Sequence, residues 1–325
     1  MLAMSLEDLK GVGRVTLKKL EEAGIRTLRQ LAVMNPEELE EMASIEPARA
    51  YELIVEARRM LGLMGSGEVT AEEYEKMLAQ VPRLKTQVQS IDELLGGGLE
   101  SGAIYEFAGE FGTGKTQLCH QLAVTAQLPR ERGGFAGKAL YIDTEGTFSP
   151  QRIREVAARF GLDGTEALRS VYVERVESVV AMEHAVRSKA PRLIEERGVR
   201  LIVVDSVIAL YRAQFRGREW LAMRQQRLNY VLDWLKRLGR VYQPLFTVIT
   251  NQVMSSPMPG LMAIKIPAGG NIVAHASTHR FILRKAGQGK HVIQVLDSPY
   301  LPKSAEAEFC IASGGVVDGS ECPEA

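Results

Sequence analysis

The sequence lacks any long apolar run: none of its 325 residues lies in a stretch that approaches the roughly 20 apolar residues a membrane-spanning helix needs. Its beginning, Met1–Met4, leads straight into charged residues, so no secretory signal is expected. Cysteine is scarce, and Cys119, Cys310 and Cys322 show no metal-ligand spacing and cannot all pair. These absences predict a protein of the cytoplasm, or of the nucleus in a eukaryote, that needs no membrane and works in a reducing compartment.

Net charge is absent as well, because 40 Lys and Arg residues balance 40 Asp and Glu residues. The charge is unevenly distributed, however, since residues 205–303 hold fourteen basic residues and four acidic ones. Such a segment predicts one basic working face, although a set of solvated helix surfaces would give the same count. A hydrophobic fraction of 46% allows a packed core, and the length predicts one large domain or two.

The strongest motif is a glycine-rich loop at Gly109–Thr116, which reads G-x-x-x-x-G-K-T. An apolar run at 103–108 precedes it and a helical pattern at 117–124 follows, which is the context of a phosphate-binding loop. In such a loop glycines allow close backbone approach, the lysine reaches the β- and γ-phosphates, and the threonine hydroxyl binds Mg²⁺. We therefore predict that a nucleotide and Mg²⁺ are held by Gly109, Phe111, Gly112, Thr113, Gly114, Lys115, Thr116 and Gln117.

Around this loop, apolar runs alternate with helical stretches. Strands are predicted at 140–143, 201–205, 245–251, 281–283, 292–296 and 309–311, and helices at 150–160, 179–197 and 220–238. Strands that alternate with helices predict a mostly parallel sheet covered on both faces. The strands from 281 onward have short connections and are predicted to extend the sheet in antiparallel fashion.

Residues 1–64 are predicted to form a small all-α domain. Leucines at helical spacing flank Gly11-Val12-Gly13, and this arrangement resembles the helix-hairpin-helix module, whose glycine turn contacts DNA phosphates without reading sequence. A helical domain that docks other proteins is the alternative. Glycines and polar residues then predict a linker at 65–84, which leaves 85–325 for the nucleotide-binding core.

Polar residues at predicted strand ends are the candidates for chemistry. Asp205 ends a buried strand and is predicted to hold Mg²⁺ together with Thr116. Glu145 follows another strand and is predicted to be the general base that polarises an attacking water, with Asp143 as the competing candidate. Gln252 ends a third strand, where its amide could bind the γ-phosphate and report its loss to the loop that follows.

Together these segments resemble the RecA/RadA family of strand-exchange recombinases, in particular the archaeal and eukaryotic group. Besides the glycine-rich loop, the stretches that carry the resemblance are 141–148, 250–253, 269–278 and 297–302. The run Gly-Gly-Asn-Ile-Val-Ala-His-Ala-Ser-Thr at 269–278 is the most specific, because nucleotide binding alone does not require it. The resemblance implies a RecA-like P-loop ATPase core of the α/β class, with a mostly parallel central sheet, joined to the helix-hairpin-helix domain.

The resemblance also implies a function. It indicates a DNA-dependent ATPase that uses ATP and Mg²⁺, assembles with its own copies into a helical filament or ring, and coats single-stranded DNA. The filament would pair that strand with a homologous double-stranded DNA and exchange strands during repair of double-strand breaks. Sequence-specific contacts are not expected, because base pairing reads the sequence.

Residue roles follow from the resemblance position by position. The resemblance implies catalytic roles for Lys115, Glu145 and Gln252. Arg152 matches the family position whose guanidinium stacks on adenine. A first DNA-binding loop matches 211–218, and a second runs from about 254 to 268. The implied DNA contacts are Arg212, Phe215, Arg216, Arg218, Lys265 and His275, of which the last links the second loop to the ATP site.

Two segments depart from the family pattern. Glu68 stands where the family's oligomerisation segment has a phenylalanine, although Ala71 of that segment remains. Ala263 and Ile264 replace an Asp-Pro pair in a second loop that is short and has a single charge. One alternative is therefore a recombinase paralogue that acts as a mediator with other recombination proteins and forms no long filament. A nucleotide-dependent adaptor that docks proteins through 1–64 and has no affinity for DNA is a further alternative.

Overall fold

The computed structural model describes residues 5–65, 67–256 and 264–322. The chain divides into a small unit, Met1–Val81 with Arg240–Tyr242, and a large unit that comprises Pro82–Gly239 and Gln243–Ala325. Within the described ranges, no helix has both the length and the apolar character that crossing a membrane requires. The small unit is all-helical and the large unit is built on one extended sheet, so the predicted α/β core with a small all-α domain is confirmed.

The small unit is held together by the leucines that predicted its helices. Its helices are α1 (Arg14–Glu22), α2 (Leu28–Ala32), α3 (Pro36–Ala43), α4 (Pro47–Met60) and α5 (Ala71–Ala79). Leu20, Leu31, Leu39 and Leu53 are buried between them. Before Gly11 the chain forms only a single 3₁₀ turn, Leu6–Asp8, and Gly11 takes up a φ of +82° in the hairpin that follows. Helix α5 lies inside the predicted linker, and none of its nine residues is buried.

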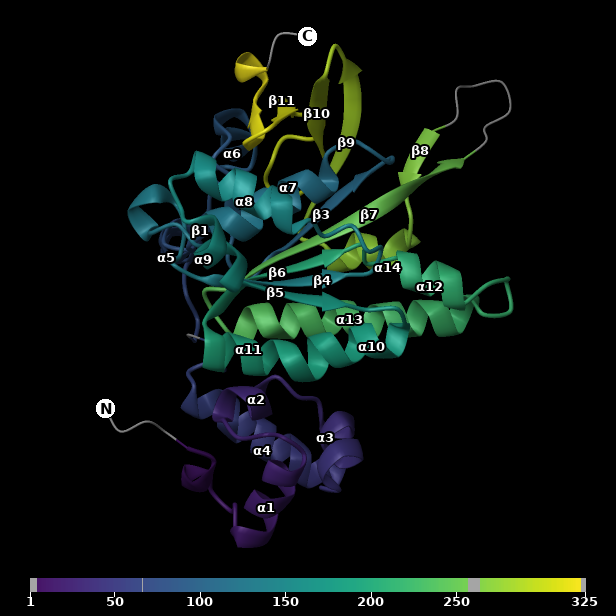
Figure 1. Cartoon of the computed structure of the whole chain (residues 1–325). Coiled ribbons are helices and arrows are strands. Elements are labelled where there is room, and N and C mark those ends of the chain that lie inside the picture. The colour runs from purple at the N-terminus through teal and green to yellow at the C-terminus, as the bar shows by residue number, and fades with distance from the viewer. Residues whose placement is uncertain (1–4, 66, 257–263, 323–325) are drawn as a thin grey trace. The chain divides into compact units, whose positions relative to one another are not determined.

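The large unit contains a ten-stranded sheet in the order β12-β11-β10-β9-β3-β7-β6-β4-β5, with β8 paired to β7 (Figure 1). The strands are β3 (Ile104–Gly109), β4 (Lys138–Asp143), β5 (Val171–Arg175), β6 (Val199–Asp205), β7 (Phe246–Ser256), β8 (Ile264–Pro267), β9 (His279–Gly287), β10 (Lys290–Asp297), β11 (Glu306–Ala312) and β12 (Gly315–Asp318). A separate two-stranded sheet joins β1 (Arg83–Leu84) to β2 (Leu99–Glu100).

One prediction about the late strands was wrong. Strand β9 pairs with β3 in parallel, and the antiparallel extension begins at β10. The reason lies in the connections. A helix, α14 (Gly270–Ala276), precedes β9 and lets it enter beside β3 in the same direction, whereas β9 and β10 are joined by a tight turn that reverses the chain.

Helices cover both faces of the sheet (Figure 1). On the upper face in that view lie α7 (Lys115–Thr125), α8 (Pro150–Arg159) and α9 (Gly164–Arg169), and on the lower face lie α10 (Val179–His184), α11 (Ala190–Arg197) and α13 (Leu221–Val241). Two shorter helices, α6 (Gln89–Leu94) and α12 (Ala209–Gln214), complete the unit. Because both faces are covered, all six residues of β3 are buried.

The sheet brings the predicted site residues to one edge. In the parallel pairing of β3 with β7, Gly109 lies opposite Gln252, and in the pairing of β4 with β6, Asp143 lies opposite Asp205. The carboxyl ends of these four strands therefore meet where the glycine-rich loop begins. In open α/β sheets this edge is where ligands bind.

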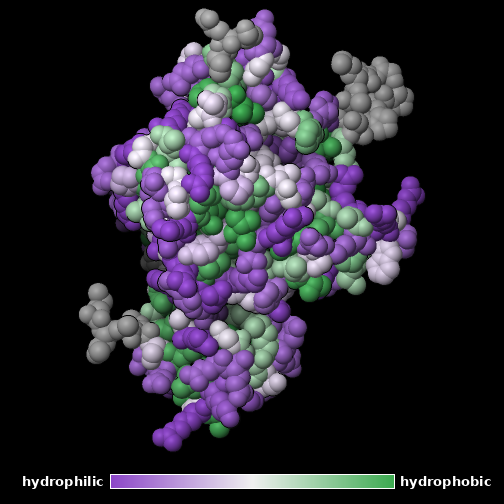
Figure 2. Space-filling view, viewed as in Figure 1, coloured by the Kyte–Doolittle hydropathy of each residue, from purple (hydrophilic) through white to green (hydrophobic). Residues whose placement is uncertain are grey.

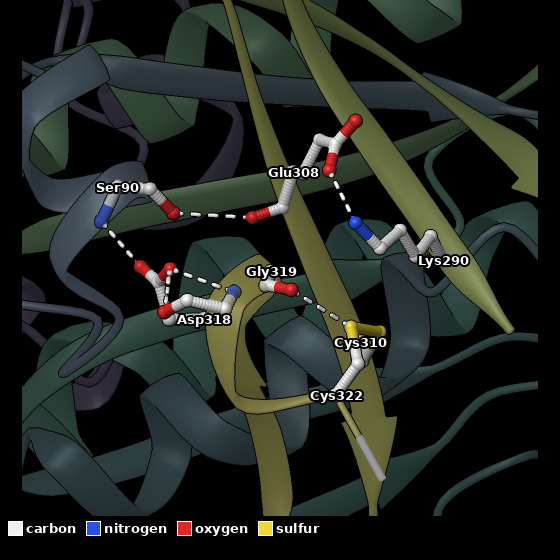
Figure 3. Close-up of a disulfide and its surroundings, with 8 residues drawn as sticks. Ser90, Lys290, Glu308, Cys310, Asp318, Gly319 and Cys322 are labelled. Carbon is white, nitrogen blue, oxygen red and sulfur yellow. Dashed lines mark hydrogen bonds and ion pairs between the residues drawn. A yellow bond between two sulfur atoms is a disulfide. The ribbon is translucent and has the colours of Figure 1, made fainter. Parts of the chain in front are cut away.

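A disulfide closes the carboxyl-terminal part of the large unit (Figure 3). It joins Cys310, buried in β11, to Cys322, twelve residues later, with 5.4 Å between the two Cα atoms. Between them, the carboxylate of Asp318 accepts the backbone N–H of Ser90 at 2.9 Å, which ties the same segment to α6. The sequence analysis took the cysteines as a sign of a reducing compartment; the structure instead pairs two of them and leaves Cys119 buried and free.

We expect this disulfide to stabilise the large unit by about 2–3 kcal/mol, because it closes a short loop and limits the unfolded chain. A reductant should lower the midpoint of thermal unfolding of the wild-type protein but leave that of Cys322→Ser unchanged. The unfolded, unreduced wild-type protein should also show one reactive thiol, which belongs to Cys119. Three reactive thiols, or an equal response of both proteins to reductant, would contradict the pairing.

Candidate functional site

A pocket of about 960 Å³ opens at the carboxyl ends of β3, β4, β6 and β7. All twelve residues that the sequence analysis assigned to nucleotide binding and catalysis line this pocket, including Phe111, which is 95% exposed at its mouth. The structure adds six further lining residues, which are Glu110, Thr147, Ser206, Thr250, Val253 and Ile311. The residues therefore meet in a single cavity although they are spread over more than a hundred positions of the sequence.

Glycines shape the loop that forms the floor of the pocket. A Cβ atom on Gly109 would lie 2.6 Å from the backbone oxygen of Leu283, and one on Gly114 would lie 2.9 Å from the ring of Phe309. Gly114 also has a φ of +97°, which disfavours any side chain. Helix α7 starts at Lys115, directly after Gly114. The N–H groups of its first turn therefore have no partner within the helix and lie at the loop, an arrangement that binds anions.

The side chain of Lys115 folds over the loop. Its Nζ donates to the carbonyl oxygens of Gly109 and Glu110, at 2.9 and 2.7 Å. Desolvation lowers the pKa of Lys115, and the carboxylates of Asp205 and Glu145 oppose that shift. The ammonium group is thus held at the loop by two neutral backbone acceptors. A phosphate is charged and therefore a stronger acceptor, so it could replace them.

Asp205 is the hydrogen-bonding centre of the pocket. Its buried carboxylate accepts the hydroxyl of Thr116 at 2.8 Å, the hydroxyl of Tyr141 at 2.7 Å, and the hydroxyl of Thr250. The described residues contain no group of three or more His, Cys, Asp or Glu side chains that could hold a metal ion alone. The oxygens of Thr116 and Asp205 nevertheless fit Mg²⁺, which commonly takes one or two protein oxygens and completes its shell with phosphate and water.

The geometry separates the two acidic candidates after β4. Asp143 is buried, and its carboxylate accepts the backbone N–H groups of the four residues 145–148 at 2.8–3.2 Å. Asp143 therefore fixes the turn that carries Glu145. The Glu145 side chain lines the pocket, and its carboxylate accepts the hydroxyl of Ser206 at 2.6 Å. Of the two, Glu145 is the carboxylate that faces the cavity.

Gln252 connects the pocket to a basic loop. Its amide nitrogen donates to the Glu145 carboxylate at 3.1 Å, and its amide oxygen accepts from the guanidinium of Arg212 at 3.2 Å. Glu145 lies after β4 and Arg212 belongs to α12, so one amide joins the pocket wall to the first predicted DNA-binding loop. The three side chains Glu145, Gln252 and Arg212 thus form one continuous line of hydrogen bonds.

Arg152 is held rigidly at the far side of the pocket. Its guanidinium donates to the side chain of Gln117 at 2.9 Å, to the carbonyl oxygens of Ala312 and Ser313 at 3.0 and 2.7 Å, and to Glu155 at 2.5 Å. With its edges engaged in this way, the planar group presents a face rather than a free donor. A guanidinium face can stack on a flat ring, as expected for an adenine contact.

The two predicted DNA-binding loops meet at a second, smaller pocket. Its volume is about 200 Å³, and its walls combine Arg212 of α12, the start of α13, and Met254 with Ala268 from the two stems of the second loop. Arg212, Arg216 and Arg218 are exposed and Phe215 is half-buried. The segment after α12 projects from the right side of the molecule in Figure 1, and its surface is mostly hydrophilic in Figure 2. Residues 257–263 of the second loop, Ala263 included, lie outside the described residues.

Of the predicted DNA contacts only Arg212 lines that small pocket, and two of the others, Lys265 and His275, lie on other elements. Lys265 in β8 forms an ion pair with Glu110 of the glycine-rich loop, with 2.7 Å between Nζ and the carboxylate oxygen. His275 in α14 lines a separate pocket of about 210 Å³ together with Lys236 of α13, whose Nζ donates to the backbone oxygen of His275 at 3.0 Å. The structure thus places Lys265 beside the nucleotide pocket and His275 on the α13–α14 surface.

Sequence reasoning missed a buried ionic network beneath the loops. Glu106 in the middle of β3 is inaccessible to solvent, and it accepts from Arg280 of β9 at 2.5 Å and from the amide of Asn251 at 2.6 Å. Asn251 also donates to the backbone oxygen of Ala268, at 2.7 Å, so it ties together both stems of the second loop. A signal was available, since Glu106 is a lone charge within an otherwise apolar strand that had to find a partner.

Comparison with known proteins identifies the family of this chain. The Rad51 family model matches residues 77–319, and a model of the tandem SAM-like helix-hairpin-helix matches residues 3–59. The chain is 39% identical over 317 residues to the DNA repair and recombination protein RadA of Metallosphaera sedula, a match that covers 98% of this chain and 96% of that protein. It is also 39% identical over 319 residues to the protein of the same description from Cenarchaeum symbiosum, with 97% and 79% covered. The chain therefore belongs to the Rad51 family of RecA/RadA-type recombinases.

Proposed function

We propose that this chain is an ATP-dependent DNA recombinase that binds single-stranded DNA, pairs it with a homologous duplex and exchanges strands in double-strand-break repair. The observation that carries the proposal is the line of hydrogen bonds from Glu145 through Gln252 to Arg212. This connection suits an ATPase whose turnover responds to a polynucleotide, because phosphates bound at the arginine-rich loop would act on Gln252 through Arg212. The family and its two RadA relatives support the same function.

In this proposal the pocket binds and hydrolyses ATP. Lys115 and the amides of the glycine-rich loop bind the phosphates, and Thr116 with Asp205 would hold Mg²⁺, which supplies charge neutralisation on the phosphate oxygens when bound. Glu145 accepts a proton from the attacking water, since it is the carboxylate that faces the cavity. Gln252 exchanges its bond with Glu145 for one with the γ-phosphate, and Arg152 stacks on the base.

Polynucleotide binding is assigned to the two loops. Arg212, Arg216 and Arg218 neutralise phosphates, and Phe215 packs against a base or sugar. Lys265 acts at the boundary with the ATP site, a role that fits its ion pair with Glu110. His275 is assigned a DNA contact from the α13–α14 surface, where it lines a separate pocket. Single-stranded and double-stranded DNA are the expected partners, together with other recombination proteins.

Assembly into a helical filament or ring is part of the proposal. The segment that begins at Glu68 is exposed, as are the apolar residues Val69 and Tyr74, so a neighbouring copy can reach it. The mediator and adaptor alternatives gain no support from the two relatives, which carry the recombinase description over nearly the whole chain. The site of action would be the cytoplasm, or the nucleus in a eukaryote, wherever the DNA resides.

Single-stranded DNA should stimulate ATP hydrolysis, because binding at the arginine-rich loop alters the Glu145–Gln252 bond. The measurement is the steady-state rate of phosphate release with and without an oligonucleotide at low salt. Affinity for the oligonucleotide should also fall with salt, with a logarithmic slope of about −2 if three arginines each neutralise one phosphate of a single strand. An ATPase rate indifferent to DNA, together with binding insensitive to salt, would overturn the proposed function.

Lys115→Ala should reduce ATP turnover by about 100-fold or more, because it removes the positioned charge that faces the transferring phosphoryl group. The matched control is Lys290→Ala, which removes an exposed lysine paired with Glu308 outside the pocket. Both variants should keep the wild-type circular dichroism spectrum. Equal turnover in the two variants would show that the glycine-rich loop is not the catalytic phosphate site.

A further inference from the structure

We propose that Trp220, with Phe215 beside it, forms a stacking platform for a base of bound single-stranded DNA. The inference rests on the proposed function, in which Phe215 already packs against a base or sugar, and adds to it a base contact at Trp220. Trp220 lies in the segment that joins α12 to α13, directly before Leu221. It belongs to the surface that carries Arg212, Arg216 and Arg218.

The exposure of Trp220 is the first observation. Its side chain is 49% exposed, whereas the other tryptophan, Trp234 of α13, is 1% exposed and lies under the guanidinium of Arg237 at 4.3 Å. A large apolar ring left half in water costs free energy and often marks a binding surface. Leu221 and Met223, the first and third residues of α13, are also exposed, at 40% and 43%, but neither offers a flat ring for stacking.

The second observation is the pairing of the two rings. The centroids of Phe215 and Trp220 are 6.3 Å apart, with 47° between the ring planes. This contact holds the indole by one aromatic neighbour while about half of its surface stays accessible. The rings are thus held in place before DNA binds. Stacking a base on Trp220 therefore costs less conformational entropy than stacking it on a side chain without such a neighbour.

The third observation is the charge around the rings, which selects the occupant. Arg212, Arg216, Arg218 and Arg224 surround this segment, against a single acid, Glu219, whose carboxylate folds back against Gly217. An apolar protein partner would leave these arginines unpaired. Single-stranded DNA matches both features of this surface. Its phosphates pair with the arginines, and its unpaired bases offer flat faces to the rings.

The position of the rings fits the path of such a strand. Leu221, the residue after Trp220, lines the small pocket shared by the two loops, together with Arg212 and Arg224. A DNA strand that follows the arginines past this pocket therefore meets the indole of Trp220 at the edge of the pocket. In a duplex the base faces are covered by stacking, so the platform favours single strands and does not discriminate between base types.

The test uses tryptophan fluorescence and two probes of equal length, an oligodeoxythymidylate and the corresponding abasic phosphodiester strand. Trp220→Ala should weaken binding of the oligodeoxythymidylate by about 5- to 150-fold, which corresponds to the 1–3 kcal/mol of one stacked base, and should leave binding of the abasic strand unchanged. Trp220→Phe should recover part of the loss. The oligodeoxythymidylate should quench the fluorescence of the wild-type protein but not that of Trp220→Phe, whose remaining tryptophan is buried.

Matched controls separate this inference from the function on which it rests. Met223→Ala removes an equally exposed apolar side chain and should leave the affinity for both probes unchanged. Wild-type affinity of Trp220→Ala for the oligodeoxythymidylate, or an equal loss for both probes, would overturn the stacking platform while leaving the proposed DNA binding intact. If the wild-type protein binds neither probe at low salt, the proposed function fails and the platform fails with it.

Discussion

The carboxylate of Asp205 is the constraint on which the rest of the site depends. It accepts hydroxyl groups from Thr116, Tyr141 and Thr250, which belong to α7, β4 and β7. Three elements that are distant in sequence are therefore fixed around one buried carboxylate, which lies beside the start of α7. Burying a carboxylate is costly unless hydrogen bonds satisfy its oxygens. The hydrogen bonds that satisfy Asp205 thus also hold three elements of the pocket wall together.

From this centre the structure reaches outward along the end of β7. Thr250 contacts Asp205, Asn251 holds both stems of the second loop through Glu106 and Ala268, and Gln252 contacts Glu145 and Arg212. Three consecutive residues therefore contact the Asp205 carboxylate, the loop stems and the Glu145 carboxylate in turn. In an extended strand neighbouring side chains point to opposite faces, which is why one strand end can serve several partners. We infer that nucleotide and polynucleotide are sensed at this strand end.

Sequence reasoning reached the pocket because glycines, strand-end acids and periodic apolar runs carry local signals. It favoured Glu145 over Asp143 as the general base but could not give the structural reason, which is that backbone amides occupy the Asp143 carboxylate. In the ten-stranded sheet it missed β5, β8 and β12, which have four or five residues each, and the parallel direction of β9, which a preceding helix determines. The disulfide and the Lys265–Glu110 ion pair were equally out of reach, because each joins segments whose proximity only the folded chain defines.

The most direct test of this account is the coupling between the two ligands. We would measure the affinity for a single-stranded oligonucleotide with and without a non-hydrolysable ATP analogue, in the wild-type protein and in Gln252→Ala. The account predicts that the analogue raises the wild-type affinity by about 5- to 150-fold, a coupling of 1–3 kcal/mol, and that it has almost no effect in the variant, although each ligand alone still binds. A variant with the full wild-type coupling would contradict the claim that Gln252 joins the pocket to the loop.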